Sequence, residues 1–125
     1  MRIALAVLMA FHGVAHLVGF AVPWGLVKPP GGTRKTTILG GRANLGSAGI
    51  RAYGVLWLLT GAAFVACAVG AVTGLHWWIH WTPWVAFASL LLSLLSWPES
   101  RIGVVVNLVI LTWFHVVGVY GWLAS

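Results

Sequence analysis

Four long apolar blocks dominate this chain and leave few charged residues to face water. Hydrophobic residues make up 61% of the 125 residues, and charged residues only 6%. A soluble domain carries roughly 25% charged residues, so seven basic side chains and one acidic side chain cannot cover its surface. Disordered chains lack the aromatic and β-branched residues that are abundant here. The composition therefore predicts a protein that is solvated mainly by lipid.

Each apolar block is close to the length of a membrane-spanning helix. A bilayer core about 30 Å thick is crossed by about 20 apolar residues in a helix. The predicted spans are residues 3–24, 51–73, 77–97 and 102–123. We therefore expect an all-α fold, an integral membrane four-helix bundle that forms a single domain over residues 1–125. The expected location is the plasma (inner) membrane.

The basic residues predict the orientation of the bundle, because cytoplasmic loops carry an excess of Lys and Arg. With four spans, the first and third connections lie on one side, and that side holds Lys28, Arg34, Lys35, Arg42, Arg51 and Arg101. We therefore expect both termini outside the cytoplasm. The basic loop 25–50 is expected to contact anionic lipid headgroups. The charges do not form a basic face with interleaved aromatic residues, so no nucleic-acid partner is expected.

Histidines inside the first and last blocks are the leading candidates for a site. His12 and His16 are four residues apart and share one helix face. Ionisable side chains at membrane depth are costly and usually face the bundle interior. At about 1.5 Å per residue, His115 lies at a depth similar to that of His12.

Three neutral imidazoles are good ligands for a transition metal, and two on facing helices can ligate a haem iron. We therefore expect His12, His16 and His115 to hold a metal or haem b, with Trp113 among the cofactor-binding residues. Asn107 is expected on the face that carries His115, because the two are eight residues apart. The alternative is a protein without a cofactor, in which each imidazole only fixes helix packing by a hydrogen bond.

Glu99 is the only acidic residue and lies just before the last block. We expect it to pair with Arg101 or another loop arginine, or to interact with the positive N-terminal end of the last helix. As the only carboxylate it is also the only candidate for general acid–base chemistry by a side-chain acid. Glu99, Arg101 and Asn107 are therefore the candidate catalytic residues.

Small residues at intervals of four predict close helix packing. They recur in the second block at Ala62, Ala66, Gly70 and Gly74, and in the third block at Ser89 and Ser93. The Trp-rich segment 76–81 contains His76 and His80, and is interpreted as an aromatic anchor at the membrane surface. An outer metal or haem site is the alternative for that segment.

Two motifs lie in the first span and before the last one: HGxxHLxGF at 12–20 and WxExRIGxxxN at 97–107. Together they resemble a group of small bacterial four-span membrane proteins, some of which are described as permeases. The resemblance implies that these two regions work together, but it implies no particular activity.

The sequence thus predicts a small redox or metal protein of the membrane, in a homo-oligomer or a larger complex. One alternative is an accessory or structural subunit of a membrane complex. Another is a membrane enzyme or transporter for a lipid, quinone or small molecule, in which His and Glu99 transfer protons. Whether the protein is an enzyme stays open at this point.

Overall fold

The described chain is a bundle of four helices. The computed structural model describes residues 2–29, 35–97 and 99–120, and within these ranges the side chains of residues 3 to 116. The helices are α1 (Arg2–Ala21), α2 (Gly46–Thr73), α3 (Trp77–Leu95) and α4 (Arg101–Tyr120). Between α1 and α2, a small antiparallel hairpin contains β1 (Thr37–Ile38), a short 3-10 turn η1 (Leu39–Gly41) and β2 (Ala43–Asn44). The expected four-helix architecture is confirmed at this level.

Three of these helices are long and apolar enough to cross a membrane: Ile3–Ala21, Gly46–Thr73 and Trp77–Leu95. The part of α4 whose side chains are described, Arg101–Val116, is apolar but shorter. Large apolar side chains such as Phe11, Trp84 and Ile102 point outward and are more than 70% exposed. These features support a membrane protein.

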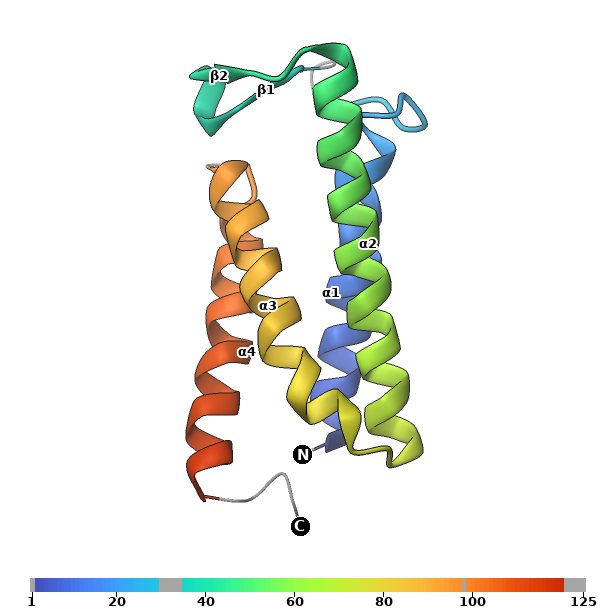
Figure 1. The fold of residues 1–125 in the computed structure, drawn as a ribbon, viewed down its shortest axis with the longest axis vertical. Helices are drawn as coiled ribbons and strands as arrows, with labels where there is room; N and C mark the ends of the chain where they lie inside the picture. Colours follow the sequence, from blue (N-terminus) through green and yellow to red (C-terminus); the bar gives the residue numbers. More distant parts are fainter. Residues whose placement is uncertain (1, 30–34, 98, 121–125) are drawn as a thin grey trace.

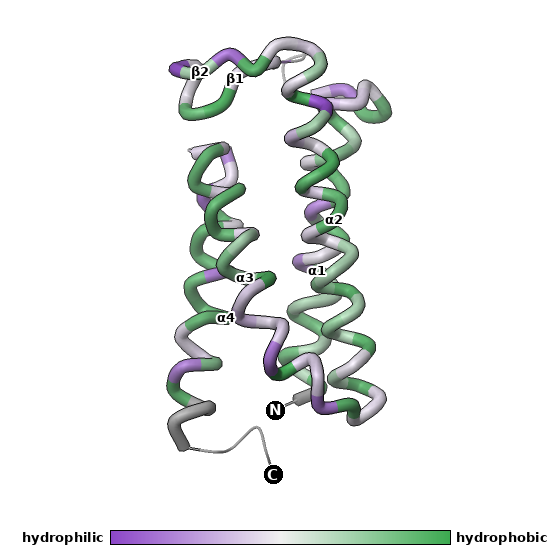
Figure 2. The backbone as a smooth tube through the Cα atoms, viewed as in Figure 1, coloured by the Kyte–Doolittle hydropathy of each residue, from purple (hydrophilic) through white to green (hydrophobic). Residues whose placement is uncertain are grey.

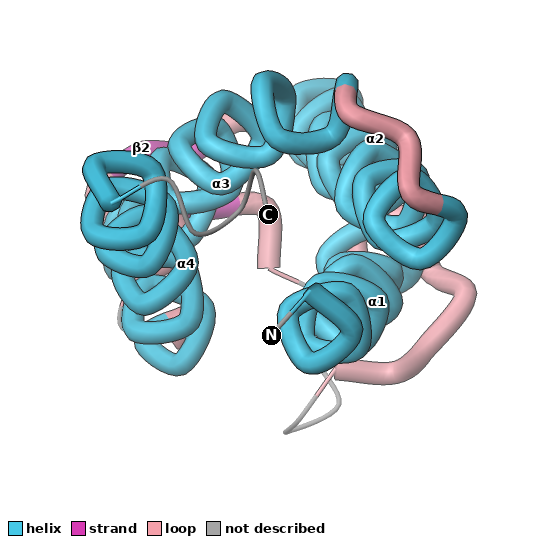
Figure 3. Tube along the Cα trace, turned by 90° about the horizontal axis from the view of Figure 1, so that it is seen from below, coloured by secondary structure: helices cyan, strands magenta, loops and turns pink. Residues whose placement is uncertain are grey.

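The helices follow one another up and down and form an arc rather than a closed square. Figure 3 shows α1 and α4 at the two ends of this arc, with α2 and α3 between them. The largest core cluster draws on all four helices and includes Met9, Phe64, Trp78, Ile110 and Phe114. Each helix therefore packs chiefly against its neighbours in the chain.

Polar residues gather at one end of the bundle. Figure 1 shows the hairpin and the α3–α4 turn at the end opposite to the start of α1 and the end of α4. Figure 2 shows hydrophilic residues in this hairpin, whereas the helices are mostly hydrophobic with isolated hydrophilic positions. The described basic side chains all belong to the elements at this end: Lys28, Lys35, Arg42, Arg51 and Arg101.

Helices α1 and α2 touch backbone to backbone at a pair of glycines. A Cβ atom added to Gly13 would lie 2.8 Å from the carbonyl oxygen of Gly61, and one added to Gly61 would lie 2.7 Å from that of Gly13. The predicted packing stripe is partly wrong, because Ala62 and Ala66 are exposed. Helix α1 instead approaches α2 closely on the face of α2 that carries Gly61.

The structure also moves the predicted helix ends. Helix α1 ends at Ala21, and the following turn contains Gly25 with a positive φ of 74°. Helix α2 begins at Gly46, five residues before the predicted span. It ends where Gly74, with φ 77°, donates its N–H to the carbonyl of Gly70, a common left-handed helix stop.

Candidate functional site

Four buried polar side chains from three helices meet in the middle of the bundle. His12 and His16 come from α1, Ser89 from α3 and Asn107 from α4. Their exposed fractions are 8%, 1%, 0% and 0%, respectively. A buried polar group is costly unless it is hydrogen-bonded, so the partners of each atom decide what this cluster can do.

The donors and acceptors of the cluster form a closed ring. His16 Nδ1 donates to the carbonyl oxygen of His12 at 2.7 Å, so His16 Nε2 is free to accept from the hydroxyl of Ser89, also at 2.7 Å. Ser89 Oγ accepts from Nδ2 of Asn107 at 2.8 Å. Asn107 Oδ1 accepts from Nε2 of His12 at 3.0 Å, which closes the ring.

This ring fits a neutral His16, because a proton on its Nε2 would displace the hydroxyl proton that Nε2 now accepts from Ser89. Aromatic rings surround the two imidazoles. The Phe64 ring centre lies 5.0 Å from that of His12, and the Trp57 ring centre lies 4.9 Å from that of His16. Apolar walls of this kind strengthen hydrogen bonds in the ring.

His115 does not join His12 and His16. It is exposed on α4, and the described residues contain no group of three or more His, Cys, Asp or Glu side chains placed to hold a metal ion. The predicted stripe fails because four residues advance a helix by about 40° beyond a full turn. Asn107 is therefore buried, Leu111 half-buried and His115 exposed.

Trp113 donates no hydrogen bond to the ring among the described residues, although both were expected at one site. Its side chain packs against the main core cluster. Its buried indole Nε1 has no hydrogen-bond partner among the described residues. His76 in the α2–α3 turn and His80 near the start of α3 are also exposed, as are Trp77 and Trp81.

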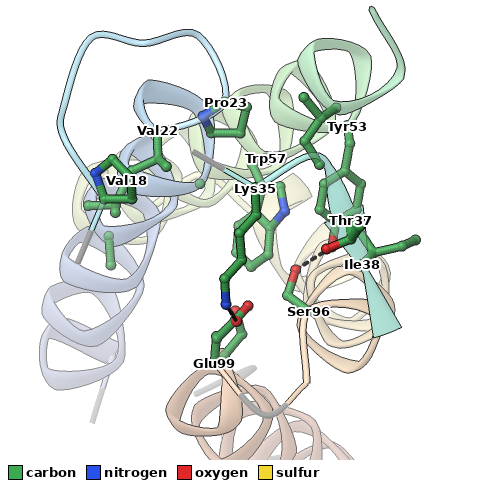
Figure 4. Close-up of a pocket in the computed structure, with 15 residues that line it drawn as sticks. Val18, Val22, Pro23, Lys35, Thr37, Ile38, Tyr53, Trp57, Ser96 and Glu99 are labelled. Atoms are coloured by element: carbon green, nitrogen blue, oxygen red, sulfur yellow. Dashed lines mark hydrogen bonds and ion pairs between the residues drawn. The ribbon is translucent and has the colours of Figure 1, made fainter. Parts of the chain in front are cut away.

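A pocket of about 440 Å³ lies at the polar end of the bundle (Figure 4). Its walls are apolar and come from α1 and α2, and include Val18, Gly19 and Trp57. Ala15 and Val18 line the pocket and are also exposed, so the pocket is open along the side of α1. A volume of about 300–1,000 Å³ is usual for a small-molecule site.

An ion pair stands at the mouth of this pocket. Lys35 Nζ lies 2.8 Å from Glu99 Oε1, and the two side chains are 69% and 62% exposed. Among the described residues the ion-pair partner of Glu99 is Lys35, whereas Arg101 or another loop arginine was expected. Arg34 lies outside the described residues, and Glu99 precedes the start of α4 by two residues, as its expected interaction with the N-terminal end of that helix requires. Arg101 is exposed at the first position of α4.

Hydroxyl groups complete the polar side of the pocket. Tyr53 Oη donates to the carbonyl oxygen of Leu92 at 2.7 Å and accepts from Ser96 Oγ at 2.5 Å. These bonds tie α2 to the end of α3. Tyr53, Ser96 and Ser100 all line the pocket, so these hydroxyl groups come from α2 and the α3–α4 turn, and Thr37 adds one from β1.

Trp57 connects the pocket to the hydrogen-bonded ring. It lines the pocket with part of its surface and packs against the His16 imidazole. An added Cβ at Gly19 would lie 2.5 Å from the Trp57 ring, so a glycine is needed there for the indole to fit. Trp57 therefore lies between the pocket and His16 of the ring.

Sequence reasoning identified His12, His16 and Asn107, but it assigned Ser89 only to helix packing and did not single out Tyr53 or Trp57. The spacing of Ser89 and Ser93 within an apolar span was the available signal for a polar contact. Comparisons of the chain with protein-family models, with curated proteins and with solved structures found no match.

Proposed function

We propose that this membrane protein binds an amphiphilic molecule of the bilayer, with the polar part at the Lys35–Glu99 pair and the apolar part against Trp57. The observation that carries this proposal is the pocket itself, which joins apolar walls from two helices to a charged and hydroxyl-lined mouth. Sites of this composition hold a ligand by apolar burial and orient it through a few polar groups. A polar-headed lipid matches both parts.

The position of the pocket supports a ligand from the membrane rather than from water. Ala15 and Val18 belong to the apolar helix α1, and their exposure opens the pocket along its side. An acyl chain therefore has an apolar path beside α1. The basic residues at the same end attract lipid headgroups, because anionic membrane surfaces draw Lys and Arg.

The ring of His12, His16, Ser89 and Asn107 has a positioning role in this proposal. It joins α1 to α3 and α4 and holds His16 against Trp57. The redox role expected from the sequence stays a prediction. It needs imidazole nitrogens for a metal, and both Nε2 atoms already serve hydrogen bonds in the ring.

Filling the pocket tests the proposal. Purified protein in mild detergent is incubated with a mixture of phospholipids, and the lipid retained per chain is measured by native mass spectrometry. We expect about one retained lipid per chain, and loss of that lipid in Ala15→Trp, whose indole occupies the pocket.

The control is Val14→Trp, which adds the same side chain at an exposed neighbouring position that does not line the pocket. It should retain lipid as the native chain does. Equal retention in the two variants, or no retained lipid in the native protein, contradicts the proposal.

A further inference from the structure

We infer that the pocket selects a headgroup carrying both a phosphate and a primary ammonium, the chemistry of phosphoethanolamine; this rests on the proposed binding of an amphiphile. The inference starts from Lys35 and Glu99, which line the main pocket and also a second cavity of about 390 Å³ beneath the hairpin. A headgroup at the mouth must therefore meet both charges.

Glu99 is the feature that sets this mouth apart. It is the only acidic residue of the chain, whereas seven residues are basic. A site for a simple anion would need only the basic residues, and a carboxylate there repels phosphate. Lys35 in the same way repels a simple cation. Placing an unfavourable charge against the wrong ligand is a common source of specificity.

A zwitterion with both groups replaces the Lys35–Glu99 ion pair by two new ion pairs. Its phosphate pairs with Lys35, and its ammonium pairs with Glu99. The Lys35–Glu99 pair is exposed, and exposed pairs contribute little to stability, so separating the two side chains costs little. Neither charge is left without a partner after the exchange.

The hydrogen bond within the pair indicates a primary ammonium rather than a quaternary one. Glu99 Oε1 now accepts from Lys35 Nζ. A primary ammonium donates the same bond, but a trimethylammonium group has no N–H to donate. Ser100 also lines the mouth and offers a hydroxyl that can donate to phosphate.

Competition between lipids of identical acyl chains tests this inference. We expect the protein to retain phosphatidylethanolamine over phosphatidylcholine and phosphatidylglycerol by about tenfold, as measured by native mass spectrometry. Glu99→Gln should shift the preference toward phosphatidylglycerol, and Lys35→Gln should reduce the retention of all three phospholipids. The charge-swapped chain, Lys35→Glu with Glu99→Lys, should regain the preference for phosphatidylethanolamine.

Arg42→Gln is the matched control, because Arg42 is an exposed cation of the same hairpin that lines neither cavity. It should leave the preference unchanged. Water-soluble glycerophosphoethanolamine should not displace the lipid at equal concentration, because it lacks acyl chains. Displacement by this soluble compound would overturn the assignment to a lipid.

The failures of the two proposals are distinguishable. Equal retention of the three lipids at one per chain overturns the headgroup inference and leaves the pocket as an amphiphile site. Absence of any retained lipid overturns both.

Discussion

His12 on α1 donates a hydrogen bond to Asn107 on α4 across 95 residues of sequence. Helices α1 and α4 lie at opposite ends of the arc (Figure 3), so this bond joins the two outer helices of the bundle. It also joins the two motifs, 12–20 and 97–107, through which the chain resembles a group of four-span membrane proteins.

Removing Asn107 should open the ring. Asn107→Ala leaves Nε2 of His12 and Oγ of Ser89 each without one partner, and should lower the free energy of unfolding by about 1–2 kcal/mol. Leu108→Ala is the control on the same helix, because Leu108 is 49% exposed. Thermal unfolding in detergent measures both variants, and equal losses would show that the ring contributes nothing specific.

The two histidines at similar predicted depth should behave differently. His12→Ala removes a buried ring and its bond to Asn107, so we expect a loss of about 1–3 kcal/mol in unfolding free energy. His115→Ala should change it by less than about 0.5 kcal/mol, because His115 is exposed.

The variants His12→Ala and His115→Ala also distinguish the hydrogen-bonded ring from the cofactor site that was predicted from the sequence. A haem or metal held by His12, His16 and His115 predicts a Soret band or a stoichiometric metal that both variants lose. An absorption spectrum with elemental analysis decides this. Loss of a bound metal in His115→Ala would contradict the assignment of His115 to the exposed face.

The fold was largely predictable from the sequence, because apolar blocks of spanning length can form little else in lipid. The HxxxH spacing also predicted correctly that His12 and His16 share an inward face. The depth of His115 along its helix is easily counted, but the direction in which its side chain points is not. Residues four apart differ in direction by about 40°, so His115, eight residues after Asn107, was assigned to the wrong face.

The pocket could not be predicted in the same way. It depends on Lys35 and Glu99, which are 64 residues apart and belong to different connections. The loop 25–50 is rich in Gly and Pro, which indicates turns but not the pairing of Thr37 with Asn44 that shapes its hairpin. Contacts of this kind follow from tertiary packing.

The crossing of α1 and α2 should tolerate no added side chain. Gly13→Ala places a methyl group 2.8 Å from the Gly61 carbonyl oxygen, so the helices must separate. We expect the free energy of unfolding to fall by about 1–3 kcal/mol. Val14→Ala, at a 55% exposed neighbouring position, is the control and should have little effect. Unchanged thermal stability of Gly13→Ala would contradict this close approach.

The Tyr53 hydroxyl should matter for both stability and the pocket. Tyr53→Phe removes the hydrogen bonds to Leu92 and Ser96. We therefore expect the free energy of unfolding to fall by about 1 kcal/mol and lipid retention to weaken. Thr60→Val is the control, because among the described residues the Thr60 hydroxyl bonds within its own helix, to the Leu56 carbonyl. A Tyr53→Phe protein with native stability and retention would show that this contact is dispensable.

The orientation of the bundle can be tested by cysteine labelling in intact cells. The excess of basic residues at one end predicts that this end faces the cytoplasm. A membrane-impermeant maleimide should therefore label Leu75→Cys, at the exposed α2–α3 turn, and should not label Lys28→Cys until the cells are opened. The native chain serves as the control, because its Cys67 is only 1% exposed and should stay unlabelled. Labelling of Lys28→Cys in intact cells, with Leu75→Cys protected, would reverse the orientation and place the pocket on the outer side.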